Sequence, residues 1–498
     1  MKYSVLFPTL VHFLYYKVMI SNFFIYNKYL FKELIMSKLK LFLILASALL
    51  ISCANPTEPE DQGTGGGTGT GGGTTTGGYV LPKGSLSQEE QKQILDPNNS
   101  TTPLFKKNDY SSKYFRIPAL ITTRNGVVLA AADRRYDKTA DLGKQSKIDV
   151  IVRRSEDLGN TWSEPILVGP GAKQTDGSDA YGDSFFINCH NGDVILGYIM
   201  NPGWQGAATS KLYKSSDDGQ TWIEIYSFGV SDLTIGNTTV KKAFAASGQG
   251  LTLRHGVNAN QKRLMFAMLA DTSTGLRVLT MISDNDGVKW TPTGMSQANN
   301  LLDETKAIEL SDGRVMLNHR RAAGTGKRAW SLGATYDATD FTLQGSDGVD
   351  PDVKDPGNNA DLVRYEFDGV PIVQGGEKYA LLIHANSDID TSSKWFGSRK
   401  NHHIKFTKND FGNGNGTQPG KYDYDKQLVK GGESLYSGYP TITVLPDGTI
   451  GTLTEETSIN AQDEYDIIWR RFNLYWLSDQ KEFVDYSTGP RFQQAIKK

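Results

Sequence analysis

The sequence has little cysteine, little histidine and almost no net charge. Its 498 residues include 2 cysteines and 7 histidines, and the formal net charge is -2. Two cysteines cannot cross-link a disulfide-rich scaffold. The histidines show no spacing typical of metal ligands, so we expect no metal and no cofactor. A net charge this close to zero gives no electrostatic reason to expect a nucleic-acid partner.

Segments with helical periodicity are also scarce beyond residue 100. Glycine is abundant, with 52 residues, and aromatic residues make up 10% of the chain. This mixture favours many short strands joined by turns. We therefore predict an all-β protein.

The N-terminal part of the chain has the composition of a targeting segment followed by a linker. Residues 36–53 place two lysines before a short apolar run that ends in Leu-Ile-Ser-Cys, which resembles a bacterial lipoprotein signal acylated at Cys53. We predict a targeting segment over residues 1–53, with Met36 as an alternative start. Residues 54–78 are rich in Gly and Thr and predict a flexible linker.

A lipid anchor followed by a flexible linker suits a domain held at the bacterial cell envelope, on the outer membrane or cell surface, or facing the periplasm. The alternative is a secretory segment that precedes a cysteine by chance. If Cys53 is acylated, Cys189 has no partner for an intramolecular disulfide. We expect Cys189 to be a packed core residue. Residues 79–102 are predicted to be a lead-in, with a short helix around Ser87–Leu95.

Three stretches share the form Ser-x-Asp-x-Gly-x-Thr-Trp. They are Ser155–Trp162, Ser215–Trp222 and a degenerate copy, Ser283–Trp290, in which Asn285 replaces the aspartate and Lys289 the threonine. Their spacing of about sixty residues indicates one supersecondary unit each. The aspartate can accept backbone N–H bonds across a turn, the glycine supplies a positive φ, and the tryptophan can pack beneath. We predict hairpin locks with a structural role.

These repeats resemble the Asp-boxes of sialidases and related β-propellers. The segment Phe-Arg-Ile-Pro at Phe115–Pro118 resembles the opening motif of exo-α-sialidases (neuraminidases), and the likeness extends over most of the chain after residue 110. The resemblance implies a six-bladed β-propeller of four-stranded antiparallel blades over residues 103–498. The alternating, aromatic segment Ile467–Asp479 is expected to supply the strand that closes the ring.

The arginine of the opening motif sits in an otherwise apolar strand, where an unpaired charge is costly, so it needs an anionic partner. In the sialidase family three arginines bind the substrate carboxylate. The resemblance places these roles on Arg116, Arg320 and Arg399, with Arg364 as the next candidate for the third. The partners would then be sialylated glycans, on glycoproteins, glycolipids or oligosaccharides.

The resemblance also implies three catalytic residues, and for two of them the sequence offers a competitor. Asp141 matches the acid/base aspartate, with Asp137 as runner-up. Glu304 matches the base that is paired with the nucleophile. Tyr439 matches the nucleophile, with Tyr436 as competitor. A neutral tyrosine suits a substrate that itself carries a carboxylate, which would repel an anionic nucleophile.

Three further residues are implied to support the site. Arg135 is expected beneath the sugar, Asp183 at a ring hydroxyl, and Glu455 at the first arginine. Pro440 departs from the family, which usually has a small polar residue after the tyrosine. We expect a retaining exo-α-sialidase. The alternatives are a trans-sialidase or anhydro-sialidase of the same fold, or a non-catalytic propeller that binds sialoglycans.

Overall fold

The computed structural model describes residues 75–76, 79–172, 180–321, 326–335, 341–343, 348–388, 398–413, 422–429, 435–459 and 463–493. They belong to one compact unit, Gly72–Lys498. The predicted targeting segment, with Cys53, lies outside the described residues. None of the helices in the described ranges is both long and apolar enough to cross a membrane.

The described strands form six sheets of four or five strands, which are the blades of a β-propeller, and two small ribbons. Blade 1 contains β4 (Tyr114–Thr122), β5 (Val128–Arg135), β6 (Ile148–Ser155) and β7 (Ile166–Leu167). Blade 2 contains β8 (Tyr181–Asn188), β9 (Val194–Met200), β10 (Ser210–Ser215), β11 (Ile223–Phe228) and β13 (Gly248–Gln249). Blade 3 contains β12 (Val240–Ala245), β14 (Leu251–Leu253), β15 (Arg263–Thr272), β16 (Gly275–Ser283) and β17 (Thr291–Met295).

The second half of the chain builds the other three blades in the same way. Blade 4 contains β18 (Leu302–Glu309), β19 (Val315–Arg321), β20 (Gly326–Gly333), β21 (Thr342–Leu343) and β22 (Val349–Asp355). Blade 5 contains β23 (Asp361–Arg364), β26 (Ala380–Ala385), β27 (His402–Thr407) and β28 (Tyr424–Gln427). Blade 6 contains β29 (Tyr436–Val444), β30 (Ile450–Thr457), β31 (Asp466–Phe472) and, as its outer strand, β3 (Thr102–Phe105).

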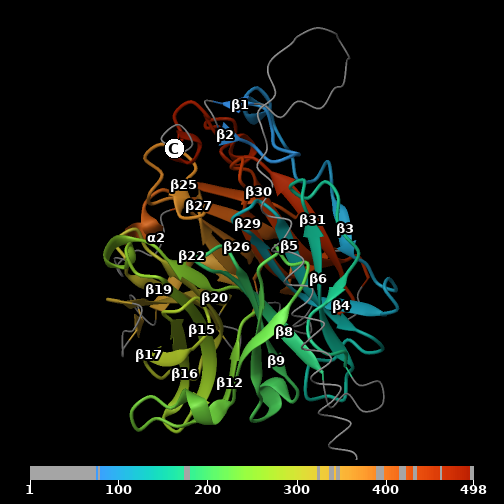
Figure 1. Cartoon of the computed structure of the whole chain (residues 1–498), viewed down its shortest axis with the longest axis vertical. Helices are drawn as coiled ribbons and strands as arrows, with labels where there is room; N and C mark the ends of the chain where they lie inside the picture. Colours follow the sequence, from blue (N-terminus) through green and yellow to red (C-terminus); the bar gives the residue numbers. More distant parts are fainter. Residues whose placement is uncertain are drawn as a thin grey trace, which may run out of the picture. The chain divides into compact units, whose positions relative to one another are not determined.

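The ring closes where the two ends of the propeller meet. In Figure 1 the colours run round the ring, and red β31 lies beside blue β3, with which it pairs antiparallel. The prediction of a closing strand in this segment is confirmed for its first part. The strand ends at Phe472, however, and Leu474–Leu477 form helix α3, because Asn473 caps the helix by accepting a hydrogen bond from the backbone N–H of Trp476.

The remaining elements are short. The ribbons are β1 (Thr75–Thr76) with β2 (Tyr79–Val80), and β24 (Glu366–Phe367) with β25 (Val370–Pro371). The helices are η1 (Glu90–Lys92), η2 (Gly203–Gln205), η3 (Val230–Leu233), η4 (Gly256–Asn258), α2 (Asp410–Asn413), α3 (Leu474–Leu477) and α4 (Pro490–Gln493). The helix predicted around Ser87–Leu95 is therefore only the single turn η1. Strand β1 falls at the end of the predicted linker.

The hydrophobic core lies between neighbouring blades. One cluster joins blade 6 to blade 1, with Trp469 of β31 and Leu453 of β30 packed in the same group as Phe115 of β4. Another joins blades 2 and 3 and contains Cys189, which is 1% exposed. Burial raises the pKa of the Cys189 thiol to about 12, so this cysteine is an inert core residue, as predicted.

The three Asp-boxes connect β6 to β7 in blade 1, β10 to β11 in blade 2 and β16 to β17 in blade 3. In the first box, Asp157 accepts hydrogen bonds from the backbone N–H (2.8 Å) and the hydroxyl (2.7 Å) of Thr161. The indole N–H of Trp162 donates to the carbonyl of Gly159 at 3.1 Å, and Gly159 has φ of 89°. These contacts confirm the predicted hairpin lock.

Each box also packs against the preceding blade. A Cβ on Gly159 would stand 2.2 Å from Trp469 of blade 6, and one on Gly219 would stand 2.8 Å from Leu129 of blade 1. A Cβ on Gly287 would stand 2.2 Å from Ile195 of blade 2. The glycine of the motif is thus needed for its positive φ and for close contact between blades.

We expect Asp157→Ala to lower the free energy of unfolding by about 1–3 kcal/mol, because the backbone N–H and hydroxyl of Thr161 and the buried hydroxyl of Ser155 lose their acceptor. Asp157→Asn should cost less, since Asn285 in the third box still accepts from the backbone N–H of Lys289 at 2.9 Å. Thermal unfolding of the two variants beside the wild type measures the difference. Equal melting temperatures for Asp157→Ala and the wild type would contradict a locking role.

Four innermost strands are irregular near their starts. The register shifts between Arg116 and Ala119 in β4, between Gly182 and Phe185 in β8, between Leu302 and Thr305 in β18, and between Ser437 and Pro440 in β29. Bulges turn side chains away from the ordinary alternation of a strand, and proline is tolerated there. Pro440 therefore fits its position, because it lies at a bulge.

Candidate active site

A cavity of about 610 Å³ lies at the end of the ring where β4, β8, β18 and β29 begin. Seven predicted site residues line it: Arg116, Asp141, Asp183, Glu304, Arg320, Arg399 and Tyr439. They come from strands of four blades and from the loops between strands. Four of them lie at the bulges of the inner strands: Arg116, Asp183, Glu304 and Tyr439. The volume suits a small-molecule ligand.

Tyr439 lies at the centre of this group of residues. Its hydroxyl donates to Glu304 Oε2 at 2.8 Å and accepts from Arg320 NH1 at 2.9 Å. The guanidinium carbons of Arg116 and Arg399 lie 5.7 and 5.3 Å from the centre of its ring. Burial and the charge of Glu304 raise the pKa of Tyr439 well above its ordinary value, against the opposing effect of Arg320 and Arg399. The phenol is therefore protonated at rest, and Glu304 is placed to take its proton.

The first arginine is held by two carboxylates. Arg116 Nε donates to Glu455 Oε1 at 2.8 Å, and NH1 lies 2.8 Å from Asp463 Oδ1. Burial opposes the charge, but Glu455 and Asp463 raise the pKa of Arg116 well above its ordinary value. This arginine therefore stays charged and faces the cavity while Glu455 holds it from behind.

Glu455 also fixes the two bulges beside it. Its Oε1 accepts from the backbone N–H of Ile117 at 2.7 Å, and its Oε2 accepts from the backbone N–H of Tyr439 at 3.0 Å. Ile117 has φ of 57°, a strained value for a β-branched residue. Gly438 leaves room for the carboxylate, because a Cβ there would stand 2.3 Å from Oε2. One buried acid thus sets the position of both Arg116 and Tyr439.

Asp141 stands at the mouth of the cavity, with its side chain 62% exposed. Its Oδ1 lies 2.8 Å from NH1 of Arg135, and NH2 of Arg135 lies 3.0 Å from Asp133 Oδ2. Partial loss of solvent disfavours the charge, but Arg135 and Arg116 together lower the pKa of Asp141 to about 2. Arg135 is 1% exposed and holds Asp141 from behind instead of lining the cavity.

Two other carboxyl groups in the cavity have raised pKa values. Burial and the charges of Asp133 and Asp141 raise the pKa of Asp183 well above its ordinary value. Burial also raises the pKa of Asp303, although Arg320 Nε lies 3.2 Å from its Oδ2 and opposes the shift. Asp183 has φ of 54°, as expected for a residue that a bulge turns into the site.

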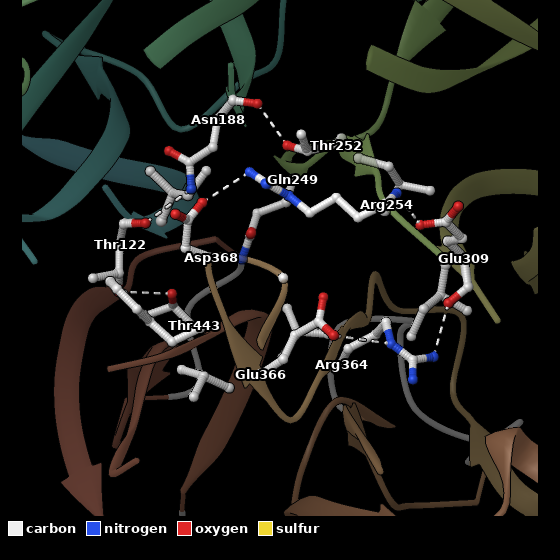
Figure 2. Close-up of a pocket in the computed structure, with 18 of the residues that line it drawn as sticks. Thr122, Asn188, Gln249, Thr252, Arg254, Glu309, Arg364, Glu366, Asp368 and Thr443 are labelled. Carbon is white, nitrogen blue, oxygen red and sulfur yellow. Dashed lines mark hydrogen bonds and ion pairs between the residues drawn. The ribbon is translucent and has the colours of Figure 1, made fainter. Parts of the chain in front are cut away.

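The runners-up do not line this cavity. Asp137 is exposed on the loop, and Tyr436 is half-buried with its ring beside the ammonium of Lys400. Arg364 lies at a second cavity, of about 140 Å³, near the other ends of the inner strands. Figure 2 shows that cavity, where Arg364 pairs with Glu366 at 3.3 Å and Arg254 pairs with Asp368 at 2.8 Å.

Sequence reasoning missed two acids and an apolar wall of the cavity. Asp303 directly precedes Glu304, which was a usable signal, whereas nothing in the sequence marks Asp463. The wall is formed by Trp204 and Phe244, whose ring centres lie 5.5 Å apart in an edge-on arrangement. Among the described residues, no group of three or more His, Cys, Asp or Glu could hold a metal ion.

Comparison with known proteins finds sialidases among the similar chains. Residues 143–364 match the family model of the BNR repeat-like domain. A sialidase of Micromonospora viridifaciens is 29% identical over 380 residues, which cover 73% of this chain and 52% of that protein. An exo-alpha-sialidase of Aspergillus fumigatus is 26% identical over 420 residues, which cover 76% of this chain and 91% of that protein.

Solved structures show the same fold. The Hadza microbial sialidase Hz136 superposes with a TM-score of 0.59 at 20% identity, covering 75% of this chain and 68% of that one. The intramolecular trans-sialidase of Ruminococcus gnavus gives a TM-score of 0.59 at 19% identity, covering 77% of this chain and 99% of that one. The match with the Micromonospora protein spans about half of that protein's length. The chain thus folds as a six-bladed β-propeller, matches a BNR repeat-like domain over residues 143–364, and is similar to sialidases.

Proposed function

We propose that the protein is an exo-α-sialidase, which hydrolyses terminal α-linked sialic acid from glycoconjugates with retention of configuration. The observation that carries the proposal is the position of Tyr439. Its hydroxyl lies 2.8 Å from Glu304 and 2.9 Å from Arg320, and the guanidinium carbons of Arg116 and Arg399 lie 5.7 and 5.3 Å from the centre of its ring. A tyrosine among three cations suits attack on an anomeric carbon that carries a carboxylate.

The substrate carboxylate would bind to Arg116, Arg320 and Arg399. Each charge-assisted hydrogen bond contributes about 1.5–3 kcal/mol, so three arginines select an anionic sugar over a neutral one. The relatives named sialidase favour sialylated glycans as the substrate class. Asp183, which lines the same cavity, would contact a hydroxyl of the sugar.

Catalysis would proceed in two steps. In the first, Asp141 gives its proton to the glycosidic oxygen as that bond breaks, and the Tyr439 oxygen bonds to the anomeric carbon while its proton passes to Glu304. In the second, Asp141 takes a proton from water, and the water oxygen replaces tyrosine, which regains its proton from Glu304. Two displacements give retention of configuration.

Asp141 must be protonated to act as the acid, whereas its ion pair with Arg135 lowers its pKa to about 2 in the free protein. Binding of the substrate opposes this shift, because a carboxylate on Arg116 offsets the positive charge that favours ionised Asp141. The Asp141 side chain is 62% exposed, so solvent reaches it at the mouth of the cavity. The bound complex therefore supplies the protonated form more readily than the free protein does.

Product analysis on α2,3- and α2,6-sialyllactose tests the proposal. Proton NMR of the first product should show the α-anomer of free sialic acid, which later mutarotates. First release of the β-anomer would contradict retention. Release of an anhydro sugar, or transfer of sialic acid to lactose, would favour the alternative enzymes, and binding without release would favour a sialoglycan-binding propeller.

We further propose that Cys53 carries a lipid that holds the propeller at the bacterial cell envelope. Cys53→Ala should then move the protein from the membrane fraction to the soluble fraction with little loss of activity, because the anchor precedes the compact unit that starts at Gly72. Fractionation of cells in high salt measures this. A variant that stays fully in the membrane fraction would contradict the anchor.

A further inference from the structure

The loop that carries Asp141, residues 136–147, is held by two neighbouring blades. It connects β5 to β6, which both belong to blade 1. On that blade Arg135 holds it, because NH1 donates to the carbonyl of Thr139 at 2.5 Å and lies 2.8 Å from Asp141 Oδ1. The two residues after the acid, Leu142 and Gly143, contact blade 2 instead. The position of Asp141 therefore depends on both blades.

Leu142 makes the apolar part of the contact with blade 2. The side chain of Asp141 is 62% exposed, whereas its neighbour Leu142 is only 5% exposed. Leu142 belongs to a core cluster that includes Ile199 of β9 and Phe244 of β12. It lies against Gly203, the first residue of η2, where a Cβ would stand 2.8 Å from the Cβ of Leu142. A buried leucine thus fixes the backbone of the loop next to an exposed acid.

Gly143 makes the polar part of the contact. Its backbone N–H donates to Asn201 Oδ1 at 2.7 Å. Asn201 directly follows β9, and its own backbone N–H donates to the carbonyl of Ala180 at 2.8 Å, so this acceptor belongs to a fixed part of blade 2. Gly143 has φ of 83°, and a Cβ on it would stand 2.4 Å from Gln205 Cγ. The loop therefore packs closely on η2.

We propose that Asn201 is a positioning residue of the reaction, which holds the loop on blade 2 so that the carboxyl group of Asp141 stays within reach of the glycosidic oxygen. The inference rests on the proposed sialidase function. A general acid must lie within hydrogen-bond distance of the atom that it protonates. When Asp141 is protonated, its ion pair with Arg135 is weakened, because the carboxyl group is then neutral. The contacts of Leu142 and Gly143 with blade 2 do not depend on that charge.

The test compares kcat/KM of Asn201→Ala and the wild type on sialyllactose and on a nitrophenyl sialoside. Lactose needs a proton to leave, whereas nitrophenolate is stable enough to leave without one. Because kcat/KM reports the steps up to departure of the leaving group, an effect on the acid appears only with sialyllactose. We expect Asn201→Ala to lose about 10-fold on sialyllactose, since a misplaced catalytic group is costly, and to change little on the nitrophenyl substrate.

Three further variants make the comparison specific. Leu142→Ala removes the apolar part of the same contact and should give the same difference between the substrates. Asn201→Asp keeps the acceptor oxygen and should restore kcat/KM on sialyllactose to within a few-fold of the wild type. The matched control is Asn191→Ala, at the exposed turn between β8 and β9, which removes a side-chain oxygen that accepts from the backbone N–H of Asp193 at 3.0 Å. It should change neither rate.

Asp141→Ala separates this inference from the proposed function, because it removes the acid itself and should also lose far more on sialyllactose than on the nitrophenyl substrate. If it does so while Asn201→Ala loses equally on both substrates, or loses nothing, the inference is overturned and the proposed function stands. If Asp141→Ala loses equally on both, the acid role fails and the inference fails with it. Should Asn201→Ala not fold, Leu142→Ala decides by the same comparison.

Discussion

Tyr439→Phe should reduce kcat on sialyllactose by on the order of 10³-fold or more, because it removes the oxygen that bonds to the anomeric carbon. The ring would stay beside Arg116 and Arg399, and the three arginines would remain, so the substrate should still bind. We therefore expect KM to change far less than kcat. Steady-state kinetics, with substrate binding measured by calorimetry on the inactive variant, would separate the two effects.

The matched control is Tyr436→Phe, which removes the same atom from the competitor three residues away. Tyr436 is half-buried and does not line the cavity, so this change should leave kcat within a few-fold of the wild type. A fluorinated sialic acid, followed by peptide mass mapping, should trap an adduct on Tyr439. An adduct on Tyr436 or on a carboxylate would transfer the nucleophile role there.

The parts of the fold that follow from local chemistry were predictable. The Asp-boxes are recognisable because turn geometry fixes the spacing of serine, aspartate, glycine and tryptophan. The strand around Arg116 was predictable from its apolar residues, and the structure places it at β4, Tyr114–Thr122. The segment after Phe472 was harder, because its alternating aromatic residues suit a strand, while the cap at Asn473 starts a helix.

The arrangement of the site was less predictable because bulges determine it. Strict alternation along β29 shows only that Tyr436 and Tyr439 should face opposite sides, and it cannot choose between them. In the structure Tyr439 is the tyrosine at the cavity. Glu455, on the neighbouring strand β30, accepts a hydrogen bond from the backbone N–H of Tyr439 and so fixes its position. Asp463 lies 347 residues after Arg116 in the sequence, and only the closed ring brings the two together. Such contacts belong to the tertiary structure and leave no local pattern.

Arg116→Lys should lower kcat/KM by about 100-fold, which is the second largest effect that we expect. Lysine keeps the charge but loses the planar fork, so it cannot bind Glu455 through Nε, contact Asp463 through NH1 and present a donor to the substrate carboxylate at once. The loss should appear as a higher KM and a lower kcat, because the carboxylate is also held less firmly as the anomeric carbon reacts. Circular dichroism should show an intact propeller.

Arg124→Lys is the matched control for this last change, since it makes the same substitution at an arginine that pairs with Asp368, a residue that lines the second cavity. Arg124 is more than one-third exposed and pairs with Asp368 at 2.8 Å. An exposed ion pair contributes about 0–1 kcal/mol, and this one lies away from the catalytic residues, so kcat/KM should not change. If Arg116→Lys keeps wild-type kcat/KM while Arg399→Lys or Arg320→Lys loses it, the carboxylate is held without Arg116. The buried pair with Glu455 would then serve only to fix the two bulges.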